Sequence, residues 1–555
     1  MIETPVPSSD LETHEVRNQP GEPDDFDALA ANPPLEEALR AFSAGWAREA
    51  IADVGRQVGS RHLRGLAGDA NRNAPELHTH DRFGRRIDVV EFHPAYHELM
   101  RRVFASGVHC LPWAEPQQGA QVARAALSYL WNQCENGVCC PVAMTFASIA
   151  ALEHDEDQKS RWAPLLTSRD YDPRPTGAGN KRGITMGMAM TEKQGGSDLR
   201  QTQTTAHPAG NAKGPGAEYL LTGHKWFFSV PMSDLFLTLA QSESGLSCFL
   251  APGWLDDGRR NGLQIQRLKD KCGNRANASS EVEFRDLRAT MLGEEGKGLA
   301  TVLQAAHLTR LECAIGSAGV MRNALVHSLH HVQNRSAFGA RLIDQPLMRN
   351  VVADLALESE AATWMTMRLA HALDRAADDE EEKLLARVGV PVAKYWICKR
   401  APAFVAEAME AQGGNGYVEE GVMGRLFRES PLNGIWEGAS NVICLDVLRA
   451  LGKTPESGKA FLAEAKTAKG GHPAFDRALA LLEEVLGNLS DDPQGARRAV
   501  ALMALVWQAS LLLRHAPEAV AAAFCESRLN DRWGVFGTLP ASAQLDDILE
   551  RASTL

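Results

Sequence analysis

The hydrophobic periodicity of this 555-residue chain changes twice, and these changes limit the folds that it can adopt. Over residues 34–182 and 291–452 apolar side chains recur at intervals near 3.6 residues, the spacing of helices that bury one face. Residues 183–290 instead hold six short apolar runs separated by glycine, asparagine and aspartate, which predict six strands in a compact β domain. A helical segment at 456–555 follows a polar break, and residues 1–33, rich in proline and acidic residues, are predicted to form a mobile arm. The sequence therefore predicts an α+β protein with a β domain between helical ones.

Composition narrows the classes of partner. Hydrophobic residues make up 44% of the chain and charged residues 23%, as in ordinary globular proteins. The formal net charge of −12 argues against the coating of nucleic acid or of an anionic membrane, although a local basic patch is compatible with it. The ten cysteines include no CxxC pair, so we expect buried thiols in a reducing compartment and no metal site.

Two further features bear on location. The first residues are acidic and lack the apolar stretch of a signal peptide. The longest apolar run, Ala499–Leu513, is shorter than the ~18 residues that a membrane span needs, so it is predicted to be a buried helix. We therefore expect a cytoplasmic protein that does not bind a membrane.

A turn motif follows the first predicted strand, at Met190–Asp198. Gly195 and Gly196 leave backbone N–H groups that can approach an anion or the edge of a flat polar ring. Thr191 and Ser197 add hydroxyl groups, each able to donate and accept hydrogen bonds. Because such glycine pairs are also common in plain hairpin turns, the motif alone leaves both interpretations open.

Three consecutive aromatic residues, Trp226, Phe227 and Phe228, stand in a later predicted strand. Side chains alternate between the two faces of a strand, so these three cannot all contact one core. One interpretation is a strand that is buried on both faces. The other is an aromatic wall against a flat cofactor.

A glycine-rich segment and an unusual glutamate occur in the C-terminal half. Gly413 and Gly414 leave bare backbone, which permits the close approach of a ligand or of another chain. Glu437 stands between Trp436 and Gly438, where it would lose hydration and become a candidate general base. The alternative is a glutamate in the first turn of a helix, where it faces the positive end of the helix dipole.

Together these segments resemble the two signatures of the acyl-CoA dehydrogenase family. Residues 189–198 fit the first signature, with Gln201 in place of the small residue that usually ends it. The second signature begins with an acidic or amide residue, followed by Gly-Gly-x-Gly-aromatic and spaced charged positions. Its matching residues are Glu410, Gly413, Gly414, Gly416, Tyr417, Glu420, Arg425 and Glu429.

The resemblance covers residues 35–450 and is strongest to the AidB branch of that family, flavoproteins of the adaptive response to DNA alkylation. Segments 187–198, 223–231 and 267–279 carry it, together with the extra helices after residue 455. It implies an N-terminal helical domain, a middle β-barrel domain, a C-terminal four-helix bundle and an extra C-terminal helical domain.

The resemblance also implies FAD, bound between the β domain and the C-terminal helices. The positions that match flavin contacts of the family are Met190, Thr191, Gly196, Ser197, Phe227, Phe228, Ser229, Gly413, Gly414, Trp436, Gly438, Ser440 and Asn441. Arg335 and Phe338 match a motif that reaches the FAD of a neighbouring subunit, which implies at least a dimer, and the family norm implies a homotetramer.

Glu437 matches the catalytic base of the family. In that role it takes a proton from the α-carbon of an acyl-CoA thioester while a hydride leaves the β-carbon for the flavin. Some members carry the base on an earlier helix, but Thr309 stands at that position here. The implied activity is FAD-dependent dehydrogenation of a short or branched acyl-CoA.

The association of the AidB branch with DNA gives a hypothesis of a different class. Non-specific binding of double-stranded DNA requires basic residues that contact phosphates, and the candidates are Arg497, Arg498 and Arg514. Residues 456–555 hold ten basic and thirteen acidic residues, a net charge of −3, which does not favour DNA. Three hypotheses stay open: a dedicated acyl-CoA dehydrogenase, a flavoprotein that protects DNA and has weak or residual dehydrogenase activity, and a structural oligomer with a vestigial flavin.

Overall fold

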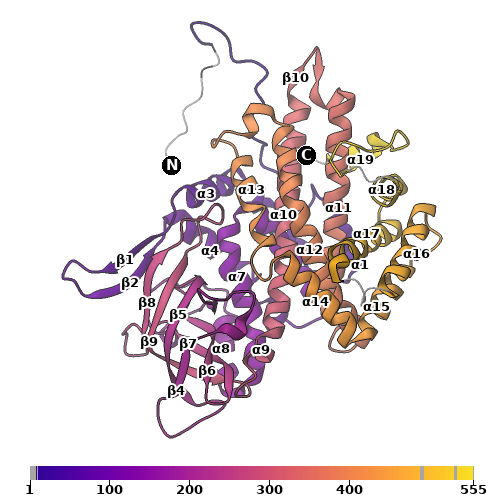
Figure 1. Ribbon diagram of the computed structural model, residues 1–555. Helices are drawn as coiled ribbons and strands as arrows, with labels where there is room; N and C mark the ends of the chain where they lie inside the picture. The colour runs from indigo at the N-terminus through magenta and orange to yellow at the C-terminus, as the bar shows by residue number, and fades with distance from the viewer. Residues whose placement is uncertain (1–7, 9, 488–492, 531–533, 554–555) are drawn as a thin grey trace.

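The computed structural model describes residue 8 and residues 10–487, 493–530 and 534–553. A β domain lies beside a bundle of long helices, and the last helices of the chain pack against the other side of that bundle (Figure 1). One continuous apolar core joins the N-terminal helices, the long helices and the C-terminal helices. The β domain has a core of its own. This arrangement confirms the predicted fold class.

The N-terminal domain is mainly helical, and two of its helices, α6 and α7, are almost wholly buried. The helices are α1 (Pro33–Ala41), α2 (Arg48–Val58), α3 (Arg61–Arg72), α4 (Pro94–Ala105), α5 (Leu111–Ala114), α6 (Ala120–Cys134), α7 (Asn136–Ile149) and α8 (Glu156–Leu166). The domain also contains a β-hairpin, β1 (Glu76–His80) and β2 (Arg86–Glu91), which the helical pattern did not predict. A turn at Gly84, with φ of +81°, explains the hairpin, because glycine adopts this conformation without steric cost.

The middle domain is a seven-stranded sheet that curls on itself. Its strands are β3 (Met186–Thr191), β4 (Thr205–Pro208), β5 (Glu218–Ser229), β6 (Leu235–Ser242), β7 (Gly245–Pro252), β8 (Leu263–Leu268) and β9 (Ser279–Leu292). The strand order is β3-β5-β4-β6-β7-β9-β8, and additional β3–β6 and β5–β9 pairings give the sheet its barrel character. The six predicted strands are present, and β4 is the strand that the sequence did not indicate.

The C-terminal helical domain is built on three very long helices. Its elements are α9 (Gly298–Thr301), α10 (Leu303–Asn334), α11 (Pro346–Arg375), α12 (Glu380–Glu410), α13 (Met423–Glu429) and α14 (Ser440–Lys453). A small hairpin, β10 (Ser336–Ala337) and β11 (Ala340–Arg341), connects α10 to α11 at one end of the bundle (Figure 1). Helix α6 packs on α10 and α11, so the N-terminal domain and the bundle share their core.

The extra C-terminal helices pack on the bundle through apolar contacts and buried ion pairs. They are α15 (Pro455–Lys466), α16 (Pro473–Gly487), α17 (Ala496–His515), α18 (Glu518–Phe524) and α19 (Leu545–Ala552). Two helical segments, Asn136–His154 and Ala496–His515, are long and apolar enough to cross a membrane, but 83% and 78% of their most apolar windows are buried inside the protein. Such burial is typical of core helices.

The N-terminal arm contacts the bundle over its described residues. The Asn18 side chain donates a hydrogen bond to the Ser336 carbonyl oxygen (2.7 Å), and Arg61 forms an ion pair with Asp24. The ring of Phe26 packs against the main core. This part of the arm thus makes polar contacts with the β10–β11 end of the bundle and with α3, and its mobility stays a prediction. Residues 1–7 and 9 lie outside the described residues.

Candidate functional site

Strand pairing places the two predicted cofactor-binding motifs side by side. Strands β3 and β5 run antiparallel, with Thr191 opposite Phe227 and Met188 opposite Ser229. The turn that follows β3 is tight, because a Cβ atom on Gly195 would lie 2.7 Å from the Asp198 carbonyl oxygen. Ser197 at this turn is exposed. The open end of β3 and β5 thus presents hydroxyl groups, bare backbone and an aromatic ring on neighbouring strands.

A buried ion pair holds this edge of the sheet in place. Lys225 Nζ lies 2.8 Å from Glu192 Oε1 and donates a second hydrogen bond to the Leu239 carbonyl oxygen (2.9 Å). Burial by itself would raise the pKa of Glu192, but the charge and hydrogen bond of Lys225 outweigh it and lower this pKa to about 2. The ionised carboxylate also accepts a hydrogen bond from the Gln203 backbone N–H (2.7 Å), so it ties the turn after β3 to the strand that follows.

The three aromatic residues of β5 take different positions. Phe227 is 50% exposed, whereas Phe228 is completely buried and contacts Phe236 inside the barrel. Strand alternation explains the difference, since neighbouring side chains point to opposite faces. Phe227 therefore fits the predicted aromatic wall, but the assignment of Phe228 to a cofactor face is wrong. Lys269 Nζ lies 3.4 Å from the ring centre of Trp226, so Trp226 contacts a cation instead.

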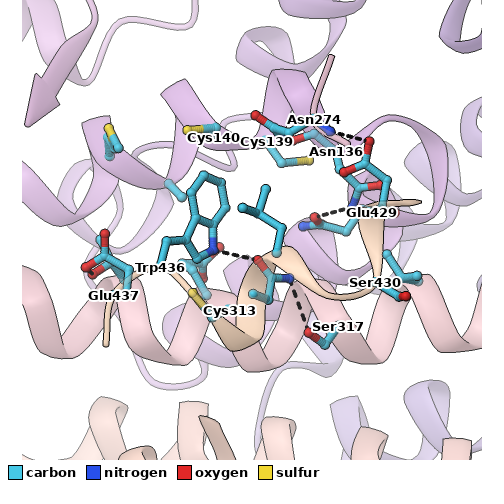
Figure 2. Close-up of a pocket in the computed structure, with 18 residues that line it drawn as sticks. Asn136, Cys139, Cys140, Asn274, Cys313, Ser317, Glu429, Ser430, Trp436 and Glu437 are labelled. Atoms are coloured by element: carbon cyan, nitrogen blue, oxygen red, sulfur yellow. Dashed lines mark hydrogen bonds between the residues drawn. The ribbon is translucent and has the colours of Figure 1, made fainter. Parts of the chain in front are cut away.

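Glu437 lies on a cavity wall between the N-terminal domain and the bundle (Figure 2). The Thr309 hydroxyl, near the start of α10, donates a hydrogen bond to Glu437 Oε2 (2.7 Å). The next residue, Arg310, donates from Nε to the Glu437 carbonyl oxygen (3.2 Å), and Lys394 donates to the Gly438 carbonyl oxygen. Glu437 has φ of +56°, a conformation that non-glycine residues rarely adopt. The surrounding contacts hold the backbone in this conformation and fix the carboxylate at the cavity.

The cavity connects Glu437 to the β domain. Its volume is about 60 Å³, enough for a few water molecules, each of which needs about 10–15 Å³. Trp436 lines the cavity and packs in one apolar cluster with Val230, the residue directly after the predicted contact Ser229. Val230 has φ of +69°, an outlier for a β-branched side chain, and strain of this kind concentrates at functional sites.

A second group of predicted residues lies at the other end of the bundle. Arg335 and Phe338 follow the C-terminal end of α10, and Phe338 is 100% exposed on the β10–β11 hairpin. Thr309 is 26 residues before Arg335, which corresponds to about 39 Å along a helix. The Gly413–Gly414 segment is at this same end, because Asn18 contacts Ser336 while the adjacent arm residue Gln19 accepts a hydrogen bond from Asn415. One chain therefore does not bring these residues to Glu437.

The residues predicted to contact DNA do not behave alike. Arg498 is exposed at the start of α17. Arg497 is exposed as well, but its Nε donates a hydrogen bond to Asn441 Oδ1 (2.8 Å). A residue predicted to contact DNA thus binds a residue predicted to contact the flavin. Arg514 forms an ion pair with the buried Glu464 (2.7 Å), so its assignment as a DNA contact is wrong.

The residues present fit a flavin. A half-exposed aromatic ring at Phe227 suits the face of a flat ring system, and the hydroxyl groups and tight glycine turn beside it suit polar ring atoms and a phosphate. Gly413 and Gly414 have open space where a Cβ would lie, so a ligand can approach their backbone. Among the described residues, no group of three or more His, Cys, Asp or Glu side chains could hold a metal ion.

Three family profiles match the chain in sequence order. They are Adaptive response protein AidB N-terminal domain at residues 18–173, Acyl-CoA dehydrogenase, middle domain, at 187–287, and Acyl-CoA dehydrogenase, C-terminal domain, at 296–452. They define the class of protein: an FAD-dependent oxidoreductase that acts on CH–CH groups.

Similar proteins locate the chain within that class. It is 43% identical to the AidB protein of Escherichia coli (strain K12), over 94% of this chain and 96% of that protein. It is 27% identical to acyl-CoA dehydrogenase family member 11 of Caenorhabditis elegans, over 88% of this chain and 85% of that protein. The chain therefore belongs to the acyl-CoA dehydrogenase family, in its AidB branch.

Solved structures agree with this assignment. Caenorhabditis elegans ACDH-11 in complex with C11-CoA superposes with a TM-score of 0.84 and 26% identity, covering 93% of this chain and 94% of that one. An acyl-CoA dehydrogenase from Bacillus anthracis, complexed with FAD, has the same fold, with a TM-score of 0.65 at 17% identity, covering 96% and 88% of the two chains.

Sequence reasoning missed several residues of the site. Lys225 belongs to the motif around the aromatic residues, yet its ion pair with Glu192 bridges segments that no local pattern connects. Thr309 stands where some family members carry the catalytic base, but the sequence does not predict its hydrogen bond to Glu437. Nothing in the sequence marks Val230 as a functional residue, because its strained backbone conformation exists only in the folded chain.

Proposed function

We propose that the protein oxidises an acyl-CoA thioester to its α,β-unsaturated product, with Glu437 as the base. One observation carries the proposal: the Glu437 carboxylate lies on a cavity wall, fixed by hydrogen bonds to its side chain and its backbone. The relative bound to C11-CoA supports a CoA thioester as the substrate class. The substrate itself is a short or branched acyl-CoA, and the activity is weak.

The chain's own residues account for proton removal. Thr309 occupies Glu437 Oε2, and Oε1 has no hydrogen-bond partner within the described part of the chain, so Oε1 receives the proton from the α-carbon. Met190, Thr191 and Ser229 would hold the edge of the cofactor, and the half-exposed ring of Phe227 would cover one face of it. FAD bound there supplies the acceptor for the hydride that leaves the β-carbon.

The decisive experiment replaces the base. Glu437→Gln preserves the shape of the side chain and removes proton acceptance, so the rate of flavin bleaching by butyryl-CoA or isovaleryl-CoA should fall by about 10²–10⁴-fold. The FAD content per chain, measured by absorbance, should stay unchanged. Glu153→Gln, a surface glutamate paired with Lys159, is the matched control and should keep the wild-type rate. An unchanged rate in Glu437→Gln would refute the role of Glu437.

We propose in addition that the protein is a cytoplasmic homotetramer in which Arg335 and Phe338 complete the FAD site of a neighbouring chain. A fully exposed phenylalanine on the hairpin beyond α10 supports this arrangement, because the end of that helix is about 39 Å along the helix from Thr309, the residue that contacts the base.

A second proposed role is protection of DNA from alkylation through non-specific binding of double-stranded DNA. The match to the adaptive-response N-terminal domain supports it, together with the adjacent exposed Arg497 and Arg498 at the start of α17. Lys466, Arg514, Arg528 and Arg551 in the extra domain already form ion pairs, so these four cations are not free to contact phosphates.

Salt titration tests the DNA role. Binding should weaken as salt rises, with a log–log slope of about −0.9 per phosphate contacted, and Arg498→Ala should make the slope shallower. Arg498 is the informative position, because Arg497→Ala would also release Asn441 near the flavin site. The control is Arg477→Ala, which removes a surface arginine bonded to Asn530. Absence of binding at low salt would remove the DNA role.

A further inference from the structure

The cavity beside Glu437 has two ends of different chemistry (Figure 2). Near Glu437 the wall is formed by Trp436, Cys140 and Cys313, which are apolar or only weakly polar. At the opposite end the side chains of Asn274 and Glu429 line it. An acyl chain that places its α-carbon at Glu437 would extend toward these polar groups.

The polar end has hydrogen-bonding capacity that the protein does not use. Asn274 is 1% exposed, and its Oδ1 atom has no hydrogen-bond partner within the described residues. Its backbone N–H donates to Glu429 Oε1 (2.7 Å), and its Nδ2 donates to the Asn136 carbonyl oxygen (3.2 Å). The second carboxyl oxygen of Glu429 has no partner in the described part of the chain either. Buried polar groups normally find partners, so two free oxygens at one end of a cavity indicate a ligand group.

The charge state of Glu429 limits what that group can be. Burial, followed by the nearby charge of Glu135, raises the pKa of Glu429 to about 7. The carboxyl group therefore both donates and accepts around neutral pH. A hydroxyl group matches this environment, because it can donate its one proton to Asn274 Oδ1 and accept a hydrogen bond from the protonated carboxyl group of Glu429. A methyl group at the same place would leave these oxygens buried and unsatisfied, which is costly.

We propose that the acyl group of the substrate carries a hydroxyl at the end farthest from the thioester, which Asn274 and Glu429 bind. This inference rests on the proposed dehydrogenation, since it names the substrate class of the same cavity. A site built to bond a hydroxyl strongly rejects the analogue that lacks it. The hydroxyl thus acts as the determinant of specificity. The apolar wall near Glu437 contacts the methylene groups between the thioester and this hydroxyl.

Matched pairs of thioesters test the proposal. Each ω-hydroxyacyl-CoA is compared with the alkyl analogue in which a methyl replaces the hydroxyl: 4-hydroxybutyryl with pentanoyl, 5-hydroxypentanoyl with hexanoyl, and 6-hydroxyhexanoyl with heptanoyl. Dissociation constants come from the shift of the flavin absorbance band in FAD-loaded Glu437→Gln protein, which binds without turnover. At least one hydroxyacyl thioester should bind about tenfold or more tightly than its partner. Equal or tighter binding of all three alkyl analogues would overturn the proposal.

Two variants assign the preference to this end of the cavity, each made in the Glu437→Gln protein. Asn274→Gly removes the carboxamide and tolerates the φ of +54° at this position, so the preference should disappear. Glu429→Gln retains an acceptor for the Asn274 N–H, so the preference should persist. A preference that survives Asn274→Gly would overturn the proposal. If no thioester bleaches the flavin of wild-type protein, dehydrogenation fails, while the binding comparison still decides the hydroxyl preference.

Discussion

At the scale of the residue, the site depends on a few side chains whose surroundings fix their positions. Glu437 is held on both sides, by the Thr309 hydroxyl at its carboxylate and by Arg310 at its backbone. A base must stay within hydrogen-bond reach of the proton that it removes, so loss of positioning lowers the rate even when the base remains. Thr309 is in this sense a positioning residue.

Replacement of Thr309 by valine tests this role. Valine has nearly the same shape but cannot donate a hydrogen bond, so kcat for acyl-CoA-dependent flavin reduction should fall about tenfold, in line with one hydrogen bond to a charged group. Thr309→Ser keeps the hydroxyl and should restore most of the rate. FAD content, measured by absorbance, should be equal in both variants. Equal rates for the valine and serine variants would show that the hydrogen bond has no catalytic effect.

At the scale of the element, the extra C-terminal helices are attached through buried charges. Glu464 of α15 forms ion pairs with Arg368 of α11 (3.0 Å) and Arg514 of α17 (2.7 Å). Burial alone would raise the pKa of Glu464, but the two arginines outweigh it and lower this pKa to about 2 from an ordinary 4.5. The ionised carboxylate of Glu464 thus connects three helices, and both ion pairs require its negative charge.

Acidification should weaken this joint in a defined window. Because the pKa of Glu464 is lower in the folded state, its contribution to stability is complete above the unfolded pKa of 4.5 and is lost as pH falls toward 2. The contribution is at most about 3 kcal/mol. In urea unfolding, the stability difference between wild type and Glu464→Gln should therefore shrink between pH 5 and the acid limit of the folded state. Glu483→Gln breaks the surface pair with Lys466 and should cost about 1 kcal/mol or less. A Glu464→Gln difference that does not change with pH would contradict the assignment.

At the scale of the whole molecule, the predicted cofactor contacts fall into two groups at opposite ends of the long helices. Thr191 and Phe227 are paired on β3 and β5, and Trp436, the neighbour of Glu437, packs with Val230 directly after β5. Arg335 and Phe338 follow the C-terminal end of α10, at the β10–β11 hairpin. If both groups bind the same FAD, they must come from different chains. An oligomer then becomes a requirement for cofactor binding as well as a consequence of exposed apolar surface.

Phe338→Asp tests this requirement. A charged side chain on the hairpin should lower the FAD content per chain and reduce the mass measured by light scattering, while circular dichroism shows an intact fold. Phe83→Asp is the matched control, because Phe83 is 66% exposed on the β1–β2 hairpin and has no predicted cofactor role. Full flavin content and unchanged mass in Phe338→Asp would contradict a contribution from a neighbouring chain.

The sequence by itself determined the domain order, six of the seven strands of the β domain and the identity of the candidate base. Periodicity reveals the helices and strands, because the two bury side chains at different spacings. The motifs around Thr191 and Glu437 could be recognised because each consists of residues that follow one another in the chain. It did not indicate that Phe228 is buried, since strand alternation needs a known register. It also could not pair Arg514 with Glu464, Arg497 with Asn441, or Lys225 with Glu192. Contacts between residues distant in the chain, and the unpartnered oxygens at the far end of the cavity, exist only once helices and strands are packed together, so only the tertiary structure decided them.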